Sequence, residues 1–293
     1  MTPSYRVMGI LNVTPDSFSD GGRYMQAEAA IAHGLLLESE GADIVDVGGE
    51  STRPGAEPVA EAQELERVLP VLHGLAERRI GAQLSIDTSK AAVARAALAA
   101  GATLVNDVSA FRAEPEIAGV VADSGADCCL MHMLGEPRTM QRQPRYRDVV
   151  DDVRAFLEER MAFAIAEGVP AERIMLDPGI GFGKTEQHNL TLLARLDELV
   201  SLGRPLVIGT SRKSFLGRII ARSAGRDEGA QPEPVGPEDR LAGTLATNVL
   251  AYERGASVFR VHDVAPVREA LAVAAATLGE RWTQRVTARS PTT

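Results

Sequence analysis

The 293-residue chain has little cysteine and no long apolar run. Its two cysteines, Cys128 and Cys129, are adjacent within an apolar segment, and adjacent cysteines fit disulfide geometry poorly. We therefore expect two buried free thiols and a reducing, cytoplasmic compartment. No apolar run approaches the roughly 18 residues of a membrane-spanning helix, and the first dozen residues do not have the layout of a signal peptide.

Positive charge is also in short supply, with 31 Lys and Arg against 40 Asp and Glu and a net charge of -9. This balance disfavours nucleic-acid and membrane partners, so an anionic substrate would have to be captured by local basic residues. The five histidines lie far apart and none has zinc-ligand spacing. Neither a Gly-x-Ser-x-Gly motif nor a Ser-His-Asp arrangement is present, which argues against a serine hydrolase.

Eight short apolar segments recur along the chain, and segments with helical periodicity separate them. They are residues 7–11, 44–47, 83–86, 103–105, 128–131, 173–176, 206–209 and 258–259. Such alternation predicts a parallel sheet, and eight units without a second compositional regime predict an α/β fold: a single-domain (β/α)₈ TIM barrel. A doubly wound open sheet is the alternative.

The barrel domain is expected to cover residues 1–280, followed by a polar, unpatterned C-terminal tail at 281–293. Residues 224–237 are rich in glycine, proline and charge, and are interpreted as an insertion in the seventh unit. The hydroxyls of Thr88 and Ser89 are expected to cap the alanine-rich helix that follows the third strand.

Polar residues stand at the carboxyl ends of the predicted strands, where the loops of a barrel line one mouth. Asp87, Asn106 and Asp177 each lie where a strand becomes a loop. Together they suit a heterocycle with N–H donors, because a carboxylate accepts two parallel hydrogen bonds. For Asp177 alone, a role as a turn former is an equal alternative. For Asp46, burial in a core layer with satisfied polar atoms is the preferred interpretation.

Basic groups are expected at the same mouth. Arg260 and His262 are two residues apart on a strand and would project together. The segment 211–214 precedes an apolar run, so its backbone N–H groups would open a helix and offer an anion site. A cationic cluster facing carboxylates suggests an anionic leaving group on a hydrogen-bonding ring. A hard cation such as Mg²⁺, held by Asn12 and phosphate oxygens, is the natural metal.

The segment 178–185 comes close to an ATP-binding phosphate loop, since it ends in Gly183-Lys184-Thr185. Pro178 replaces the first glycine and has no N–H to offer to a phosphate. We therefore expect a tight glycine loop that brings backbone close to a flat ligand.

Several long motifs resemble those of the dihydropteroate synthase family. Residues 8–22 are similar to its first signature, 48–55 to its second loop, 177–184 to its sixth, and 211–213 with 260–262 to its last two. The resemblance covers about residues 7–278. It implies a transferase that joins 6-hydroxymethyl-7,8-dihydropterin pyrophosphate to p-aminobenzoate in folate biosynthesis, with Mg²⁺ and a dissociative mechanism that releases pyrophosphate first.

The resemblance also implies roles for individual residues. The pterin would be bound by Asp87, Asn106, Met131, Asp177, Lys213 and Arg260. The pyrophosphate would be bound by Asn12, Thr52, Arg53, Arg260 and His262, with Asn12 also holding the metal. The p-aminobenzoate would be framed by Phe18, Arg53, Pro54, Phe182, Lys213 and Ser214. The catalytic residues would be Lys213, Asp87, Asp177 and Arg260.

Further expectations follow from the same resemblance: a homodimer formed by helices of the later units, and competition of sulfonamides with p-aminobenzoate. Residues 12–22 would be a lid, least ordered when the site is empty. Two alternatives remain. A pterin-binding methyltransferase module is not expected to carry both Ser-Arg-Lys and Arg-x-His, and a non-catalytic pterin-binding homologue is disfavoured by Asn12, Lys213 and His262.

Overall fold

Eight parallel strands form the centre of the molecule in a computed structural model that describes residues 5–14, 23–52, 55–225 and 235–287. The strands lie in the order β6-β5-β4-β3-β2-β1-β8-β7. Their bounds are β1 (Arg6–Asn12), β2 (Ile44–Gly48), β3 (Gln83–Asp87), β4 (Leu104–Asp107), β5 (Asp127–Met131), β6 (Ile174–Asp177), β7 (Val207–Ile208) and β8 (Val258–Val261). Leu176 forms a parallel bridge with Leu206, which joins the two ends of the sheet into a barrel.

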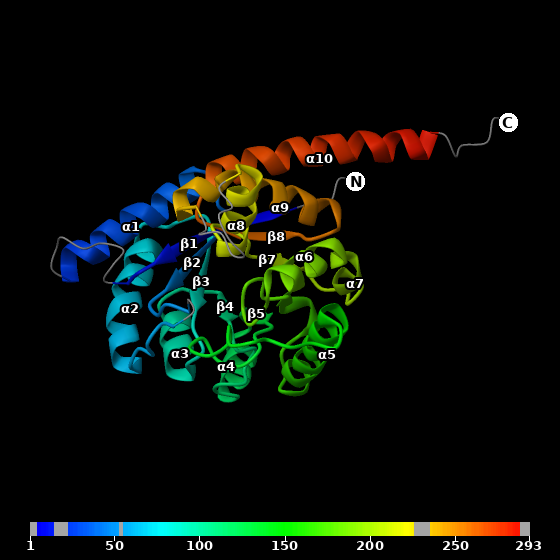
Figure 1. Cartoon of the computed structure of the whole chain (residues 1–293). Helices are drawn as coiled ribbons and strands as arrows, with labels where there is room; N and C mark the ends of the chain where they lie inside the picture. Colours follow the sequence, from blue (N-terminus) through cyan, green and yellow to red (C-terminus); the bar gives the residue numbers. More distant parts are fainter. Residues whose placement is uncertain (1–4, 15–22, 53–54, 226–234, 288–293) are drawn as a thin grey trace.

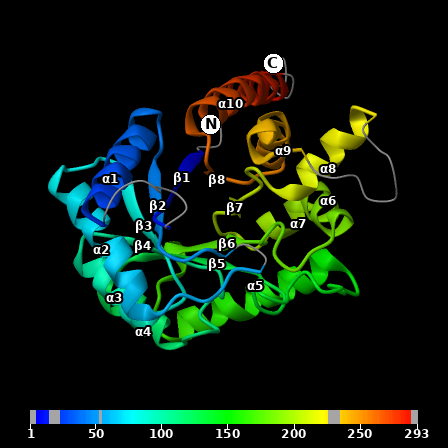
Figure 2. The same ribbon diagram turned by 60° about the vertical axis from the view of Figure 1, so that its left-hand side comes forward.

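Helices follow the strands and surround them (Figures 1 and 2). They are α1 (Arg23–Ser39), α2 (Glu61–Glu77), α3 (Ala91–Ala99), α4 (Glu116–Ser124), α5 (Val149–Ala166), α6 (Glu186–Ala194), α7 (Leu196–Val200), α8 (Ser214–Ser223), α9 (Leu241–Glu253) and α10 (Val264–Thr287), with two 3₁₀ turns, η2 (Ala171–Arg173) and η3 (Pro237–Arg240). The predicted single-domain TIM barrel is therefore confirmed, and the open-sheet alternative is excluded by the closure.

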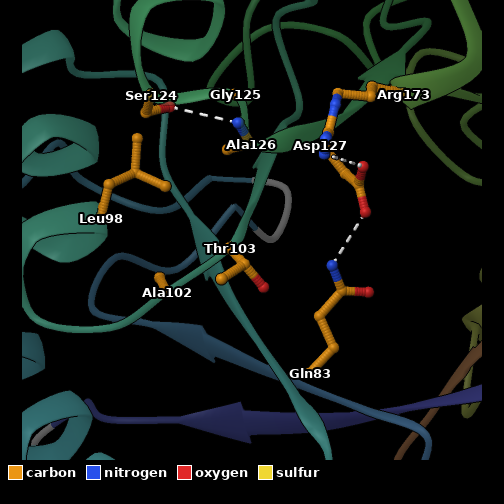
Figure 3. Close-up of a pocket in the computed structure, with 9 residues that line it drawn as sticks. All are labelled: Gln83, Leu98, Ala102, Thr103, Ser124, Gly125, Ala126, Asp127 and Arg173. Carbon is orange, nitrogen blue, oxygen red and sulfur yellow. Dashed lines mark hydrogen bonds and ion pairs between the residues drawn. The ribbon is translucent and has the colours of Figure 1, made fainter.

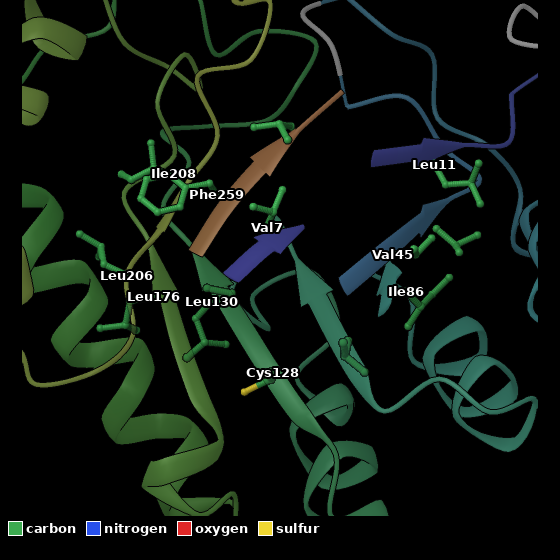
Figure 4. Packing of buried hydrophobic residues seen from close by; sticks show 14 of the residues in the cluster. Val7, Leu11, Val45, Ile86, Cys128, Leu130, Leu176, Leu206, Ile208 and Phe259 are labelled. Atoms are coloured by element: carbon green, nitrogen blue, oxygen red, sulfur yellow. The ribbon is translucent and has the colours of Figure 1, made fainter. Parts of the chain in front are cut away.

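Alternation along the strands divides the core into two layers, because successive side chains of a strand point to opposite faces. Outward residues such as Val7, Cys128 and Phe259 pack in the large cluster between sheet and helices (Figure 4). Their inward neighbours form a separate apolar cluster inside the barrel: Met8, Ile44, Leu104, Cys129, Met175, Val207 and Val258. This inner cluster is the floor on which the polar residues nearer the carboxyl ends of the strands rest.

Both cysteines are buried and free, as the sequence predicted. Across the described ranges, no helix is long and apolar enough to cross a membrane.

The expected capping of α3 by Thr88 and Ser89 is wrong. Lys90 occupies the N-cap position and makes no side-chain capping hydrogen bond. Instead, the Glu114 carboxylate accepts a hydrogen bond from the N–H of Ala91 at 2.7 Å. A carboxylate from the following β4–α4 connection thus satisfies the first turn of α3, and it also suits the positive end of the helix dipole.

The last helix is longer than the sequence suggested, since α10 continues past residue 280 to Thr287. It extends beyond the barrel wall at the top of Figure 1. Of the insertion at 224–237, residues 226–234 lie outside the described residues. Its end is held to the barrel wall, because Arg240 Nε donates to the carbonyl of Val235 at 2.8 Å.

Candidate active site

Asp46 is the hub of a polar layer directly above the apolar floor of the barrel. It is fully buried on β2. One oxygen accepts a hydrogen bond from Ser85 Oγ at 2.5 Å, and the other accepts from Asn106 Nδ2 at 2.9 Å and from Arg260 Nε at 2.7 Å. The interpretation of Asp46 as a satisfied core residue is confirmed. Its three contacts fix the side chains of Asn106 and Arg260 within the barrel.

Arg260 bridges two acidic strand ends. Its Nη2 donates to Asp87 Oδ2 at 2.6 Å, while its Nε holds Asp46. Burial opposes the charge of Arg260, but the two carboxylates outweigh this effect and raise the pKa of its guanidinium. Burial is also the largest influence on Asp87 and raises its pKa to about 7, although Arg260 lowers it. The site thus holds a fixed cation beside a carboxyl group that titrates near neutral pH.

Asp177 ends β6 on the other side of the mouth. Its Oδ1 accepts a hydrogen bond from the N–H of Gly179 at 2.7 Å, which is the turn-forming role considered above. Burial raises the pKa of Asp177, opposed by this hydrogen bond and by the charge of Lys213. Asp177 therefore shapes its loop and also places a carboxyl group close to a lysine. Met131 lies beside it in the strand register.

Lys213 lies over the ring of Phe182, with its Nζ 4.1 Å from the ring centroid. Gly181, at φ +85°, has no side chain to obstruct this contact, since a Cβ there would stand 3.2 Å from Lys213 Cδ. Phe182 packs against a small apolar cluster of Val108, Met131, Met133 and Met140. A flat apolar wall with a cation in front of it therefore faces the acidic groups.

Lys184, the lysine of the sequence that resembled a phosphate loop, points inward and is 3% exposed. Its Nζ lies 2.8 Å from His132 Nδ1 and donates to the carbonyl of Phe182 at 3.1 Å. Burial lowers the pKa of Lys184 to about 7 and that of His132 to about 2. A neutral His132 is the acceptor for Lys184, which ties the β6–α6 loop to the end of β5. Lys184 is committed to the protein interior, so a phosphate loop is excluded.

The predicted anion side of the mouth is built by β7, β8 and the start of α8. Ser211 Oγ lies 3.0 Å from His262 Nδ1 and accepts from the backbone N–H of His262 at 3.1 Å. When Ser211 donates to Nδ1, the ring proton of His262 is on Nε2, where it can serve an anion. The helix begins at Ser214, after Lys213. The expected anion site on the N–H groups of 211–214 is only partly present, because those of Arg212 and Lys213 already donate to Thr244 Oγ1 and to the carbonyl of Thr210. Arg212 is turned away and forms a bidentate pair with Asp263 at 2.6 and 3.0 Å.

A cavity of about 420 Å³ opens at this end of the barrel. The residues of the β2–α2 loop that line it include Ser51 and Thr52, and Asp87 and Met133 lie on other parts of its wall. The N–H of Gly55 donates to the carbonyl of Pro137 at 3.3 Å, so this loop reaches across to the β5–α5 loop. The cavity therefore lies beneath the β2–α2 loop, next to Asp87.

A second cavity, of about 440 Å³, lies at the amino ends of β3 to β6 (Figure 3). It is lined by polar groups that already pair with each other, since Asp127 accepts from Gln83 at 2.9 Å and from Arg173 at 3.4 Å. None of the predicted site residues lines it.

The structure brings together most of the predicted residues at the mouth: Asp87, Asn106, Met131, Asp177, Phe182, Lys213, Arg260 and His262. Asn12 ends β1, Thr52 lines the cavity, and Ser214 is exposed at the start of α8. Phe18, Arg53 and Pro54 lie outside the described residues, as does most of the predicted lid at 12–22.

Sequence reasoning missed Lys90, Lys184 and His132. The sequence did contain a signal for the two lysines. Only three of the 31 basic residues are lysines, and each follows the end of a strand, where the loops line the barrel mouth.

Comparison with known proteins gives consistent matches. Residues 8–262 match the family model described as pterin binding enzyme. Dihydropteroate synthase from Escherichia coli K12 is 44% identical over 279 residues, covering 95% of this chain and 94% of that protein. The structure of Xanthomonas albilineans dihydropteroate synthase with 4-aminobenzoic acid superposes with a TM-score of 0.82 at 45% identity, covering 98% and 94% of the two chains. A Yersinia pestis dihydropteroate synthase–sulfonamide complex gives 0.85 at 43% identity, covering 94% and 95%. The chain belongs to the pterin-binding enzyme family and, within it, to the dihydropteroate synthases.

Proposed function

We propose that this protein condenses 6-hydroxymethyl-7,8-dihydropterin pyrophosphate with p-aminobenzoate to give 7,8-dihydropteroate and pyrophosphate, the dihydropteroate synthase step of folate biosynthesis. The observation that carries the proposal is that acidic and amide groups lie on one side of the barrel mouth and groups suited to an anion lie on the other. Buried acidic and amide groups lie on β2, β3, β4 and β6, while His262 and the start of α8 form a side suited to an anion. A hydrogen-bonding ring with an anionic leaving group matches both sides.

The acidic side suits the pterin ring. The carboxyl groups of Asp87 and Asp177 can accept hydrogen bonds from ring N–H and amino groups, and Asn106 is held with its amide nitrogen on Asp46. Lys213 and the Phe182 ring would form the opposite wall of the pterin and p-aminobenzoate site. Ser214, the next residue after Lys213, would also contact p-aminobenzoate.

The charges favour a dissociative reaction. The bond between the pterin methylene carbon and the pyrophosphate oxygen breaks first, and the electron pair leaves with pyrophosphate. The carboxylates stabilise the cation that remains, while His262 and Thr52 would stabilise the anion. The amine of p-aminobenzoate then attacks the methylene carbon and loses a proton to solvent. This route requires no enzyme nucleophile.

A magnesium ion fits the leaving-group side. A Cβ on Gly48 would stand 3.9 Å from Asn12 Oδ1, so no side chain at Gly48 covers this oxygen. The nearby Asp87 Oδ2 is already bound by Arg260 Nη2. Among the described residues, no group of three His, Cys, Asp or Glu side chains could hold a metal. Asn12 would therefore share Mg²⁺ with pyrophosphate oxygens and water, a pattern that this ion favours. When bound, it would neutralise charge on the leaving group.

Two further properties are proposed with the activity. A homodimer is supported by exposed apolar side chains on neighbouring helices, Leu250 on α9 and Val273 on α10. A cytoplasmic location is supported by the free thiols of Cys128 and Cys129.

The direct test is to mix purified protein with the pterin pyrophosphate, p-aminobenzoate and Mg²⁺, and to measure dihydropteroate and pyrophosphate. Both products should form in equal amounts. Absence of both would contradict the proposal and favour a non-catalytic pterin-binding protein. Lys213→Ala should lower kcat/KM by about 100-fold or more with an unchanged circular dichroism spectrum, since a positioned charge at a reacting site typically contributes on this order. Unchanged kinetics would remove Lys213 from the site.

Sulfonamides offer a test of the p-aminobenzoate pocket. The structurally similar Yersinia pestis dihydropteroate synthase is described in complex with a sulfonamide drug. We expect a sulfonamide to raise the apparent KM for p-aminobenzoate in this protein without changing the maximal rate. Purely non-competitive inhibition would mean that the two compounds do not share a pocket.

A further inference from the structure

Lys90 forms ion pairs with two carboxylates from different parts of the chain, Glu50 and Glu64. It stands between the end of β3 and α3, outside the set of residues assigned to the substrates above. Its two partners have unequal surroundings. The Glu64 side chain, on α2, is fully buried, whereas that of Glu50, at the start of the β2–α2 loop, is 22% exposed.

Glu64 depends on Lys90 for its burial. Its Oε2 pairs with Lys90, and its Oε1 is one of the buried side-chain atoms that have no hydrogen-bond partner within the described part of the chain. A buried carboxylate without a counter-charge is strongly destabilising. The Lys90–Glu64 ion pair therefore links α2 firmly to the end of β3.

Glu50 attaches the β2–α2 loop to the Lys90–Glu64 ion pair. While its Oε2 binds Lys90, its Oε1 accepts a hydrogen bond from the N–H of Val59 at 3.2 Å. Val59 lies shortly before α2, so the hydrogen bond between Val59 and Glu50 joins the two ends of the loop. At its far side the loop is held by the hydrogen bond from Gly55 to Pro137. Between these two attachments lie Ser51 and Thr52, which line the cavity beside Asp87.

We propose that Lys90 is a positioning residue that anchors the β2–α2 loop over the cavity through Glu50 and thereby sets the affinity for p-aminobenzoate. The inference rests on the proposed function. The groups assigned to the pterin, such as Asn106 and Asp177, lie within the last two residues of barrel strands and do not depend on this loop. The same loop carries Thr52, which is assigned to the pyrophosphate, and residues 53 and 54, which the resemblance assigns to p-aminobenzoate. Loss of the anchor therefore weakens binding of p-aminobenzoate and of the pyrophosphate group, and leaves binding of the pterin ring itself intact.

The first variant is Glu50→Ala, which releases the loop but leaves the Lys90–Glu64 pair in place. We expect KM for p-aminobenzoate to rise at least tenfold, while Kd for the dihydropterin alone stays within twofold of the wild-type value. The amide of Gly55, which is remote from residue 50, should exchange its hydrogen at least tenfold faster. Glu50→Gln keeps one acceptor, its amide oxygen, which can bind either Lys90 or the N–H of Val59, and should restore part of the affinity.

A second pair of variants separates positioning from stability. Lys90→Met should lower Tm and raise KM for p-aminobenzoate, because it leaves Glu64 without a counter-charge and also frees Glu50. The double variant Lys90→Met/Glu64→Leu should recover Tm, since an apolar side chain of similar volume then fills the site, yet its KM should remain raised. Arg78→Met is the control: it removes the exposed pair with Glu28 at the far end of α2 and should leave KM unchanged.

Recovery of KM together with Tm in the double variant would overturn the proposal, as would wild-type KM and Gly55 exchange in Glu50→Ala. These results differ from failure of the proposed function, in which the wild-type protein would form no product. In that case the exchange of the Gly55 amide would still report whether Glu50 anchors the loop.

Discussion

Lys184 and Lys90 are both partly or wholly withdrawn from water, but their surroundings affect their protonation in opposite directions. Burial lowers the pKa of Lys184 to about 7, because the charges of Asp177 and its other neighbours do not compensate for lost hydration. Burial also acts against the charge of Lys90, but hydrogen bonds to Glu50 and Glu64 outweigh it and raise its pKa. Lysine thus serves in two ways: Lys184 is an interior hydrogen-bond donor with a pKa near 7, and Lys90 is a permanent cation.

The three lysines make these protonation states measurable. In protein labelled with [¹³Cε]lysine, three resonances are expected, and that of Lys184 should titrate with a midpoint near pH 7. Since the unfolded value is near 10.5, the folded state binds fewer protons between these pH values, and this group makes stability increase from about pH 7 to 10.5. The Lys184→Met variant assigns the signal. Titration of all three resonances near 10.5 would contradict a buried amine.

Asp87 should make pterin binding dependent on pH. Its pKa is raised to about 7, so the carboxylate that can accept pterin N–H groups forms as the pH rises from 6 to 8. We expect Kd for the dihydropterin, measured calorimetrically, to fall by about tenfold over this range. In the ligand-free protein the sign is opposite: stability contributed by Asp87 is lost as the pH rises from its unfolded value towards 7. Asp87→Asn should bind weakly and flatten the dependence. A pH-independent wild-type Kd would refute this role.

At the scale of elements, the β6–α6 loop shows how glycine permits close packing between neighbouring units. Gly179 has φ +64°, and a Cβ there would stand 1.9 Å from the carbonyl oxygen of His132. Two backbones would have to separate to admit even one methyl group. The loop is thereby pressed against the end of β5, where Lys184 then bonds to His132.

Gly179→Ala should therefore lower the free energy of unfolding by about 3 kcal/mol or more, because strain in the left-handed region adds to a backbone clash. Gly203→Ala is the matched control. It has φ +74° but nothing within 4 Å of its Cβ position, so it should cost only about 1 kcal/mol. Urea unfolding of both variants isolates the contribution of the clash. Equal costs would mean that the loop moves aside easily.

Sequence reasoning located all eight strands because each is an apolar run ended by polar residues, a pattern that depends only on neighbours in the chain. It also identified Asp46 as a buried, satisfied residue, since its place inside a strand determines that environment. It failed for the α3 cap because Glu114, more than twenty residues away, provides the hydrogen bond instead. Lys90 was missed for the same reason: its two partners come from other units, 40 and 26 residues away.

At the scale of the whole molecule, charge is distributed unevenly. The net charge is -9, yet Lys213 and Arg260 lie at one end of the barrel among buried acids. Desolvation makes each of these charges interact more strongly than its counterparts on the surface. A small number of basic groups in the mouth can therefore hold an anionic substrate against the unfavourable overall charge.

The proposed homodimer is the remaining question at this scale. Leu250 on α9 is 47% exposed and Val273 on α10 is 68% exposed, and the two helices pack against each other. Burying each side chain in an interface would contribute up to about 1.5–3 kcal/mol. The 31.2 kDa chain should sediment as a dimer, and Leu250→Glu/Val273→Glu should sediment as a monomer. Ile165→Glu, on α5, is the control and should remain dimeric. Retention of the dimer by the double variant would place the interface elsewhere, while unchanged pterin affinity would show that the barrel mouth is complete within one chain.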